Sequence, residues 1–153
     1  MSIEARILEL GLTLPTAPAA AGTYSPVVII DKMAYISGQG PVGPEGTLLR
    51  GRVGEDLTEE EGVFAARTVG LTMLATLKAQ LGTLDRVKRI VKVLGMVNSS
   101  ADFQNHPKVI NGFSDLMVEI WGEEGRAARS AVGMGSLPGN ITVEIEAILE
   151  LTE

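Results

Sequence analysis

The spacing of apolar residues along the chain predicts two long helices. Apolar residues recur at helical spacing over residues 63–81, and Gly82 is placed to end that helix. Just before it, Thr58 and Glu61 have the spacing of a capping box, in which each residue hydrogen-bonds the backbone of the other. A second run at helical spacing covers residues 107–121. A shorter helix is expected at about residues 3–10, capped by Ser2 and ended by Gly11.

Runs of β-branched and alternating apolar residues predict the strands. Residues 26–31 and 33–37 indicate a hairpin with a tight turn at Asp31 and Lys32. A long loop follows, because residues 38–56 hold six glycines and two prolines. The later strands are expected at 87–97, 128–135 and 141–151.

The strand at 87–97 is apolar on both faces. Simple alternation places Val91, Val93 and Val97 on one face, and Ile90, Leu94 and Met96 on the other face with Lys92. Two helices cannot cover both faces of a sheet of five or six strands. We therefore expect a single α+β domain over residues 1–153, with both long helices on one face of the sheet. The second face should be buried in an assembly.

Composition narrows the function. The chain of 153 residues has no cysteine and one histidine, so thiolate chemistry and a multi-histidine metal centre are excluded, and no metal is expected. A net charge of −6 argues against nucleic-acid binding. No apolar stretch reaches the length of about 20 residues that a membrane helix needs, and the N-terminus has no leader pattern. A cytoplasmic protein without membrane contact is expected.

One arginine stands out among the charged positions. Arg129 lies on a predicted strand with Ala131 and Gly133 on the same face. Its planar, forked donors suit a carboxylate ligand held by two bonds. The alternative, commoner for a charged strand residue, is a cross-strand ion pair with Glu144 or Glu146 of the last strand. The pattern alone leaves both open.

Two motifs near the C-terminus form a specific combination, Arg129-Ser-Ala-Val-Gly-Met-Gly-Ser-Leu-Pro138 followed by Val143-Glu-Ile-Glu-Ala147. Residues 17–24, 35–39 and 102–103, and then Asn111, add to this combination. Together these motifs resemble the YjgF/RidA family of imine and enamine deaminases, also called endoribonuclease L-PSP. The resemblance extends from about residue 17 to residue 151, so the N-terminal helix is an addition to it.

The resemblance implies a fold, an assembly and a site. The fold would be chorismate-mutase-like α+β, a mixed β-sheet with two long helices packed on one face. The assembly would be a homotrimer whose sheets form a central barrel, with active sites in the clefts between subunits. Arg129 would bind the substrate carboxylate and Glu144 would position or activate water. Tyr24, Ser37, Gly38 and Asn111 would line the pocket with Ala131, which stands where many family deaminases have cysteine.

The expected reaction is hydrolysis of a 2-imino or enamine acid to a 2-keto acid and ammonia. It requires no cofactor, because water attacks the imine carbon and the site supplies orientation and an acid/base group. Besides Ala131, the longer segment 104–107 departs from the family pattern. These departures keep a second hypothesis open, a non-catalytic trimer that binds a small carboxylate metabolite. The ribonuclease name is disfavoured by the acidic charge and by the single histidine, His106.

Overall fold

The computed structural model describes residues 1–153 as one five-stranded sheet with three helices. The strands follow the spatial order β1-β2-β5-β3-β4. Only β3 and β4 run parallel, and the other neighbours are antiparallel, so the sheet is mixed and the fold is α+β. No helix is both long and apolar enough to cross a membrane. The strands are β1 (Val27–Ile30), β2 (Met33–Gln39), β3 (Val87–Asn98), β4 (Ala128–Met134) and β5 (Val143–Leu151), and the helices are α1 (Ile3–Glu9), α2 (Glu59–Leu81) and α3 (His106–Trp121).

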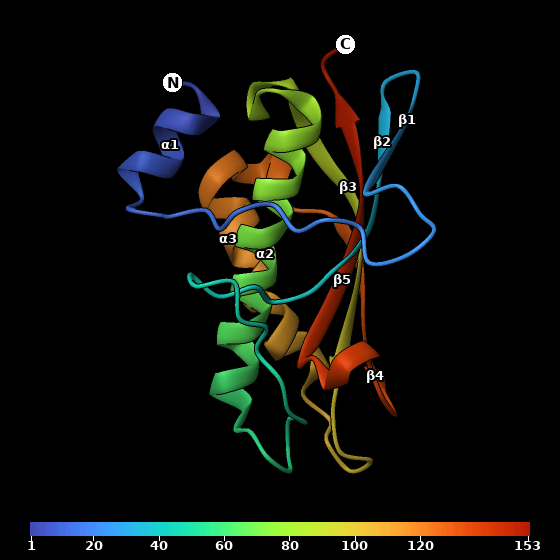
Figure 1. The fold of residues 1–153 in the computed structure, drawn as a ribbon. Coiled ribbons are helices and arrows are strands. Elements are labelled where there is room, and N and C mark those ends of the chain that lie inside the picture. The colour runs from blue at the N-terminus through green and yellow to red at the C-terminus, as the bar shows by residue number, and fades with distance from the viewer.

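Helices α2 and α3 lie on the same side of the sheet (Figure 1). The two helices approach so closely that a side chain at Gly112 of α3 would collide with the backbone of Val63 and Arg67 in α2. Gly70 of α2 similarly makes room for Leu116 of α3. Between the helices and the sheet lies a cluster of 27 buried apolar residues.

The local features expected from the sequence are present where they were predicted. At the start of α2, the Glu61 amide donates to the Thr58 hydroxyl over 3.2 Å, and the Thr58 amide donates to the Glu61 carboxylate over 3.3 Å. Gly82 ends the helix with a φ of 84°, a conformation that favours glycine. The hairpin of β1 and β2 is also confirmed, and its turn places Asp31 at a φ of 53°.

The faces predicted for β3 need one correction. The pairing of β3 with β5 shifts register between Ile90 and Lys92, so Val91 is an extra, bulged residue. The bulge resets the alternation, and Ile90 joins Val93 in the core at 1% and 2% exposure. The prediction that Ile90 shares a face with Leu94 and Met96 is therefore wrong.

The sheet face away from α2 and α3 carries exposed apolar side chains. Tyr35 of β2 pairs with Val28 of β1, and both side chains are more than 40% exposed. Val132 of β4 lies on the same face and is 38% exposed. Such a face is uncommon on a monomeric protein unless it contacts something else.

Helix α1 is attached to the body of the protein by backbone and side-chain bonds. The Ile3 amide donates to the Asp85 carboxylate over 2.7 Å, and Arg6 Nε donates to the Glu119 carbonyl over 2.9 Å. The segment that follows, residues 13–20, makes no backbone–backbone hydrogen bond. Figure 1 shows this segment running across α2 toward the sheet.

Candidate functional site

Four of the predicted site residues line one cavity of about 440 Å³. Tyr24 comes from the loop before β1, Ser37 and Gly38 from the end of β2, and Glu144 from the start of β5. The cavity is completed by Ala21, Gly40, Pro138 and Ile141. The sheet register therefore brings together residues that are up to 120 positions apart, from 24 to 144.

A β-bulge places Ser37 and Gly38 in this cavity. The pairing of β2 with β5 shifts register between Ile36 and Gln39, so two residues face one residue of β5. A side chain at Gly38 would collide with the carboxylate of Glu144. Glycine is thus required here for the carboxylate to lie against the backbone of β2.

Glu144 is the most electrostatically perturbed group of the cavity. The carboxyl is half-buried and forms neither a hydrogen bond nor an ion pair within the chain. Burial raises the pKa of Glu144 above its ordinary value, and the nearby charge of Glu146 raises the pKa further. A carboxyl with a raised pKa and no partner within the chain is suited to accept and return a proton.

Hydrogen bonds fix two further residues of the cavity wall, Ser37 and Tyr24. The Ser37 hydroxyl donates to the Ser25 carbonyl over 2.6 Å, which ties β2 to the loop before β1. The Tyr24 hydroxyl accepts from the Ala21 amide over 3.1 Å, while 48% of the Tyr24 residue stays exposed. The ring of Tyr24 is therefore held in place with much of its surface free to contact a ligand.

The neighbours of Arg129 exclude an ion pair with the glutamates of β5. Strand β4 pairs with β3 and not with β5, so Arg129 has Val93 beside it and has no glutamate of β5 as a neighbour. Val93 faces the core, and Arg129 reaches toward α3 on that same side. The cross-strand ion pair with Glu144 or Glu146 is therefore wrong.

Helix α3 orients the Arg129 guanidinium through three hydrogen bonds. Nη1 donates to Asn111 Oδ1 over 2.8 Å and to Ser114 Oγ over 3.1 Å, and Nη2 donates to the Pro107 carbonyl over 3.4 Å. These bonds leave Nε–H and one Nη2–H without a partner, and no carboxylate lies within ion-pair distance. Adjacent free donors on a preoriented guanidinium are suited to bind a carboxylate by two bonds.

Sequence reasoning missed Ser114 as a partner of Arg129. A signal was available, because Ser114 lies three residues after Asn111 and thus one helical turn further along the same face of α3. Ala131 is two residues beyond Arg129 on the same face of β4 and is partly buried against the core. Arg129, Asn111 and Ser114 form one cluster, which we call the arginine half-site.

The arginine half-site and the Glu144 cavity lie on opposite faces of the sheet. Glu144 pairs with Met96 of β3, one residue out of phase with the core-facing Val97 and Val143. Arg129 is in phase with the core-facing Val93. One chain therefore contains both groups of predicted site residues but does not bring them together. No three His, Cys, Asp or Glu side chains gather in a way that would hold a metal ion.

Comparisons with known proteins agree on one family. The family described as "YjgF/chorismate_mutase-like, putative endoribonuclease" matches residues 4–151. Protein TCP17 of Trypanosoma cruzi is 43% identical over 97% of this chain and 94% of its own length. A solved structure from Shewanella oneidensis is 36% identical with a TM-score of 0.94, over 99% of this chain and 100% of that one. The bovine 2-iminobutanoate/2-iminopropanoate deaminase is 30% identical over 86% of this chain and 82% of its own length. The chain belongs to the YjgF family.

Proposed function

We propose that this protein hydrolyses 2-imino or enamine acids to 2-keto acids and ammonia. Water adds to the imine carbon, a carbon–oxygen bond forms, the carbon–nitrogen bond breaks, and nitrogen leaves as ammonia. The observation that carries the proposal is the unpaired, half-buried Glu144 in a cavity with Tyr24, Ser37 and Gly38. The similarity to the bovine deaminase points to the same chemistry.

Each proposed catalytic group follows from its surroundings. Glu144 takes a proton from the attacking water and returns it to the departing nitrogen, a role favoured by its raised pKa. Arg129 holds the substrate carboxylate through its free Nε–H and Nη2–H donors, so that the imine carbon is presented in a fixed orientation.

A complete site requires a second copy of the chain. Arg129 and Glu144 lie on opposite faces of one sheet, so a small substrate can meet both only where two chains adjoin. The exposed apolar face around Val28, Tyr35 and Val132 supplies a surface for such contact. We therefore propose a homotrimer, the assembly that the family resemblance implies, with one site in each cleft.

The test is ammonia release from imino acids that are generated in the assay. An amino-acid oxidase produces the imine continuously, and the rate of ammonia formation is compared with and without the protein. We expect acceleration over spontaneous hydrolysis by the wild type and a loss of about 10²–10⁴-fold in Glu144→Gln. Wild-type turnover in the folded Glu144→Gln variant would refute the role of Glu144.

Ala131 favours a second candidate function, a non-catalytic trimer that binds a small carboxylate metabolite. Alanine offers no acid or nucleophile where many family deaminases have cysteine. The two functions differ in the role of Glu144 and share Arg129. Binding of pyruvate that depends on Arg129, without any acceleration of imine hydrolysis, would favour the binding protein.

A further inference from the structure

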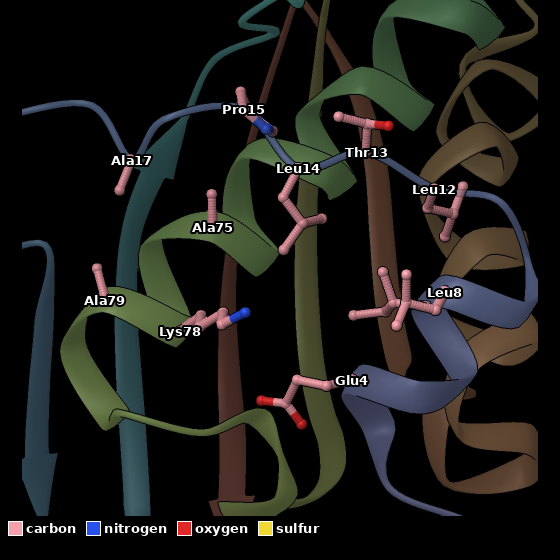
Figure 2. A pocket seen from close by; sticks show the side chains of 11 residues that line it. Glu4, Leu8, Leu12, Thr13, Leu14, Pro15, Ala17, Ala75, Lys78 and Ala79 are labelled. Carbon is pink, nitrogen blue, oxygen red and sulfur yellow. The ribbon is translucent and has the colours of Figure 1, made fainter.

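The largest cavity is separate from Arg129 and from the Glu144 cavity. It lies between α1, the segment after α1, and α2. It measures about 590 Å³, within the range of roughly 300–1,000 Å³ that small-molecule sites occupy. Most of its wall is apolar, with Leu8, Leu12 and Leu14 on the N-terminal side and Ala75 and Ala79 on α2. Figure 2 shows the side chains of Leu8 and Leu14 directed into the same space.

The cavity exists because the segment after α1 stands away from α2. Residues 13–20 make no backbone–backbone hydrogen bond, and the side chain of Leu14 packs this segment against the core. On α2 the facing positions are the small residues Ala75 and Ala79. Leu8 is 78% exposed and lines the cavity, so its side chain is free to contact an apolar ligand.

Two charges of opposite sign border this apolar space. Lys78 of α2 forms no ion pair and no hydrogen bond, and Figure 2 shows its ammonium extending from α2 toward Leu8. Glu4 of α1 accepts hydrogen bonds from the Leu84 amide over 2.8 Å and from the Thr83 hydroxyl over 3.1 Å, both through Oε1, so Oε2 accepts no hydrogen bond from another residue.

Lys78 and Glu4 are close enough to influence each other although they do not form an ion pair. Burial raises the pKa of Glu4, but the bonds from Leu84 and Thr83 and the field of Lys78 outweigh burial and leave that pKa below its ordinary value. Glu4 is therefore ionised at neutral pH. The Glu4 carboxylate and the Lys78 ammonium thus lie near each other without pairing. Together they complement a molecule that has a positive and a negative group attached to one carbon atom.

We propose that this cavity binds a large apolar α-amino acid. The ligand carboxylate contacts the Lys78 ammonium, the ligand ammonium contacts the free oxygen of Glu4, and the ligand side chain covers Leu8, Leu14 and Ala75. An uncharged apolar ligand would leave both charges without partners, and a simple carboxylate or amine would satisfy one of them. The site is separate from Arg129 and Glu144, so the proposal does not depend on the proposed hydrolysis.

The test uses calorimetric titration with L-phenylalanine and three analogues. 3-Phenylpropanoate lacks the ammonium, 2-phenylethylamine lacks the carboxylate, and L-alanine lacks the large side chain. We expect phenylalanine to bind about fivefold more tightly than either half-analogue, because a partly exposed charge pair contributes about 1 kcal/mol. Alanine should bind about 10- to 100-fold more weakly, through loss of apolar burial. Equal affinity for all four compounds, or no binding of phenylalanine at millimolar concentration, would overturn the proposal.

Charge-removing variants make the assignment specific. Lys78→Gln should weaken phenylalanine and 3-phenylpropanoate about fivefold and leave 2-phenylethylamine unchanged, whereas Glu4→Gln should show the reverse preference between the half-analogues. Matched controls are Lys32→Gln and Glu45→Gln at exposed positions outside the cavity, which should change nothing. An effect of Lys78→Gln on the amine equal to its effect on the acid would contradict the proposed orientation.

Two further variants distinguish this cavity from the arginine half-site as the place where phenylalanine binds. Ala79→Leu places a larger side chain in the cavity at an exposed helical position and should abolish binding while the fold is kept. Arg129→Ala removes the guanidinium of the arginine half-site and should leave the affinity for phenylalanine unchanged. Loss of binding in Arg129→Ala, with binding retained in Ala79→Leu, would assign the ligand to the arginine half-site and refute the new site.

Discussion

Mixing Arg129→Ala chains with Glu144→Gln chains is expected to restore activity that neither variant has alone. Each variant lacks one half of every cleft, so each homotrimer should be nearly inactive. The two residues lie on opposite faces of one sheet, so the proposed cleft takes Arg129 from one chain and Glu144 from its neighbour. A mixed trimer can therefore contain a cleft in which both residues are wild type.

The size of the recovery follows from this arrangement. In random trimers formed from equal amounts of the two variants, about half of the clefts receive an intact Arg129, and about half of those receive an intact Glu144. About a quarter of the clefts are thus complete. Because loss of the acid/base group alone costs about 10²–10⁴-fold, recovery to about 25% of wild-type activity would stand far above the activity of either variant.

The assay co-refolds or co-expresses the two variants, verifies mixed trimers by native mass spectrometry and then measures ammonia release. A chain with both substitutions is the control, because mixing it with Glu144→Gln leaves every cleft without Glu144 and should restore nothing. Mixed trimers that show only the activity of the separate variants would refute the shared cleft. Full activity in either unmixed variant would show that the residue concerned is not catalytic.

Three other perturbations test individual contacts. Arg129→Ala removes three partly exposed hydrogen bonds to α3 worth about 0.5 kcal/mol each, so thermal unfolding should show a Tm lowered by about 3–6 °C; an unchanged Tm would mean that these bonds contribute nothing. Burial and the nearby charge of Glu146 raise the pKa of Glu144 in the folded chain. The folded chain therefore favours the protonated carboxyl, and the free energy of unfolding falls as pH rises through that raised pKa. Glu144→Gln should therefore raise Tm at neutral pH, with a gain that shrinks in mildly acidic buffer, and a lowered Tm would reveal a compensating positive group from another chain. Gly38→Ala forces the Glu144 carboxylate away from β2 and should reduce turnover about 100-fold in a folded protein; wild-type turnover would show that the carboxylate position is not critical.

Features that depend on nearby residues could be predicted from the sequence. The capping box needs only Thr58 and Glu61, three positions apart, and the end of α2 needs only Gly82. The hairpin turn at Asp31 likewise depends on a few adjacent positions. Short-range hydrogen bonds and backbone preferences determine all of these, so the sequence pattern contains the necessary information.

Features that depend on distant pairing were harder to predict. The bulge at Val91 arises from the register between β3 and β5, and no residue of β3 alone marks it. The partner of β4 could have been inferred, because a strand, a helix and a strand in succession favour a parallel pair, and β3, α3 and β4 follow that order. That inference would have removed the Arg129–Glu144 ion pair from consideration.

The family resemblance identified candidate site residues that alternation alone did not. Tyr24, Ser37, Gly38 and Glu144 gather in one cavity, although composition and spacing gave no reason to group them. Their grouping depends on the bulge in β2 and on its register with β5, both of which are long-range properties. Alternation in β5 already places Glu144 on the face opposite to the core-facing Val143 and Ile145, whereas the face of Arg129 follows from its pairing with Val93 of β3.

The close contact at Gly112 fixes the position of the residues that orient Arg129. Its neighbour Asn111 holds the Arg129 guanidinium, and any side chain at position 112 would push α3 away from the α2 backbone. Asn111 and Ser114 would then move with α3, so a side chain at position 112 should weaken the proposed binding of a carboxylate at Arg129. Amide hydrogen exchange should reflect this arrangement, with slow exchange in α3 where the helices meet and fast exchange in residues 13–20, which lack backbone hydrogen bonds. The protein thus joins a closely packed helix pair that orients the Arg129 guanidinium to an N-terminal segment that is held without backbone hydrogen bonds at the proposed amino-acid cavity.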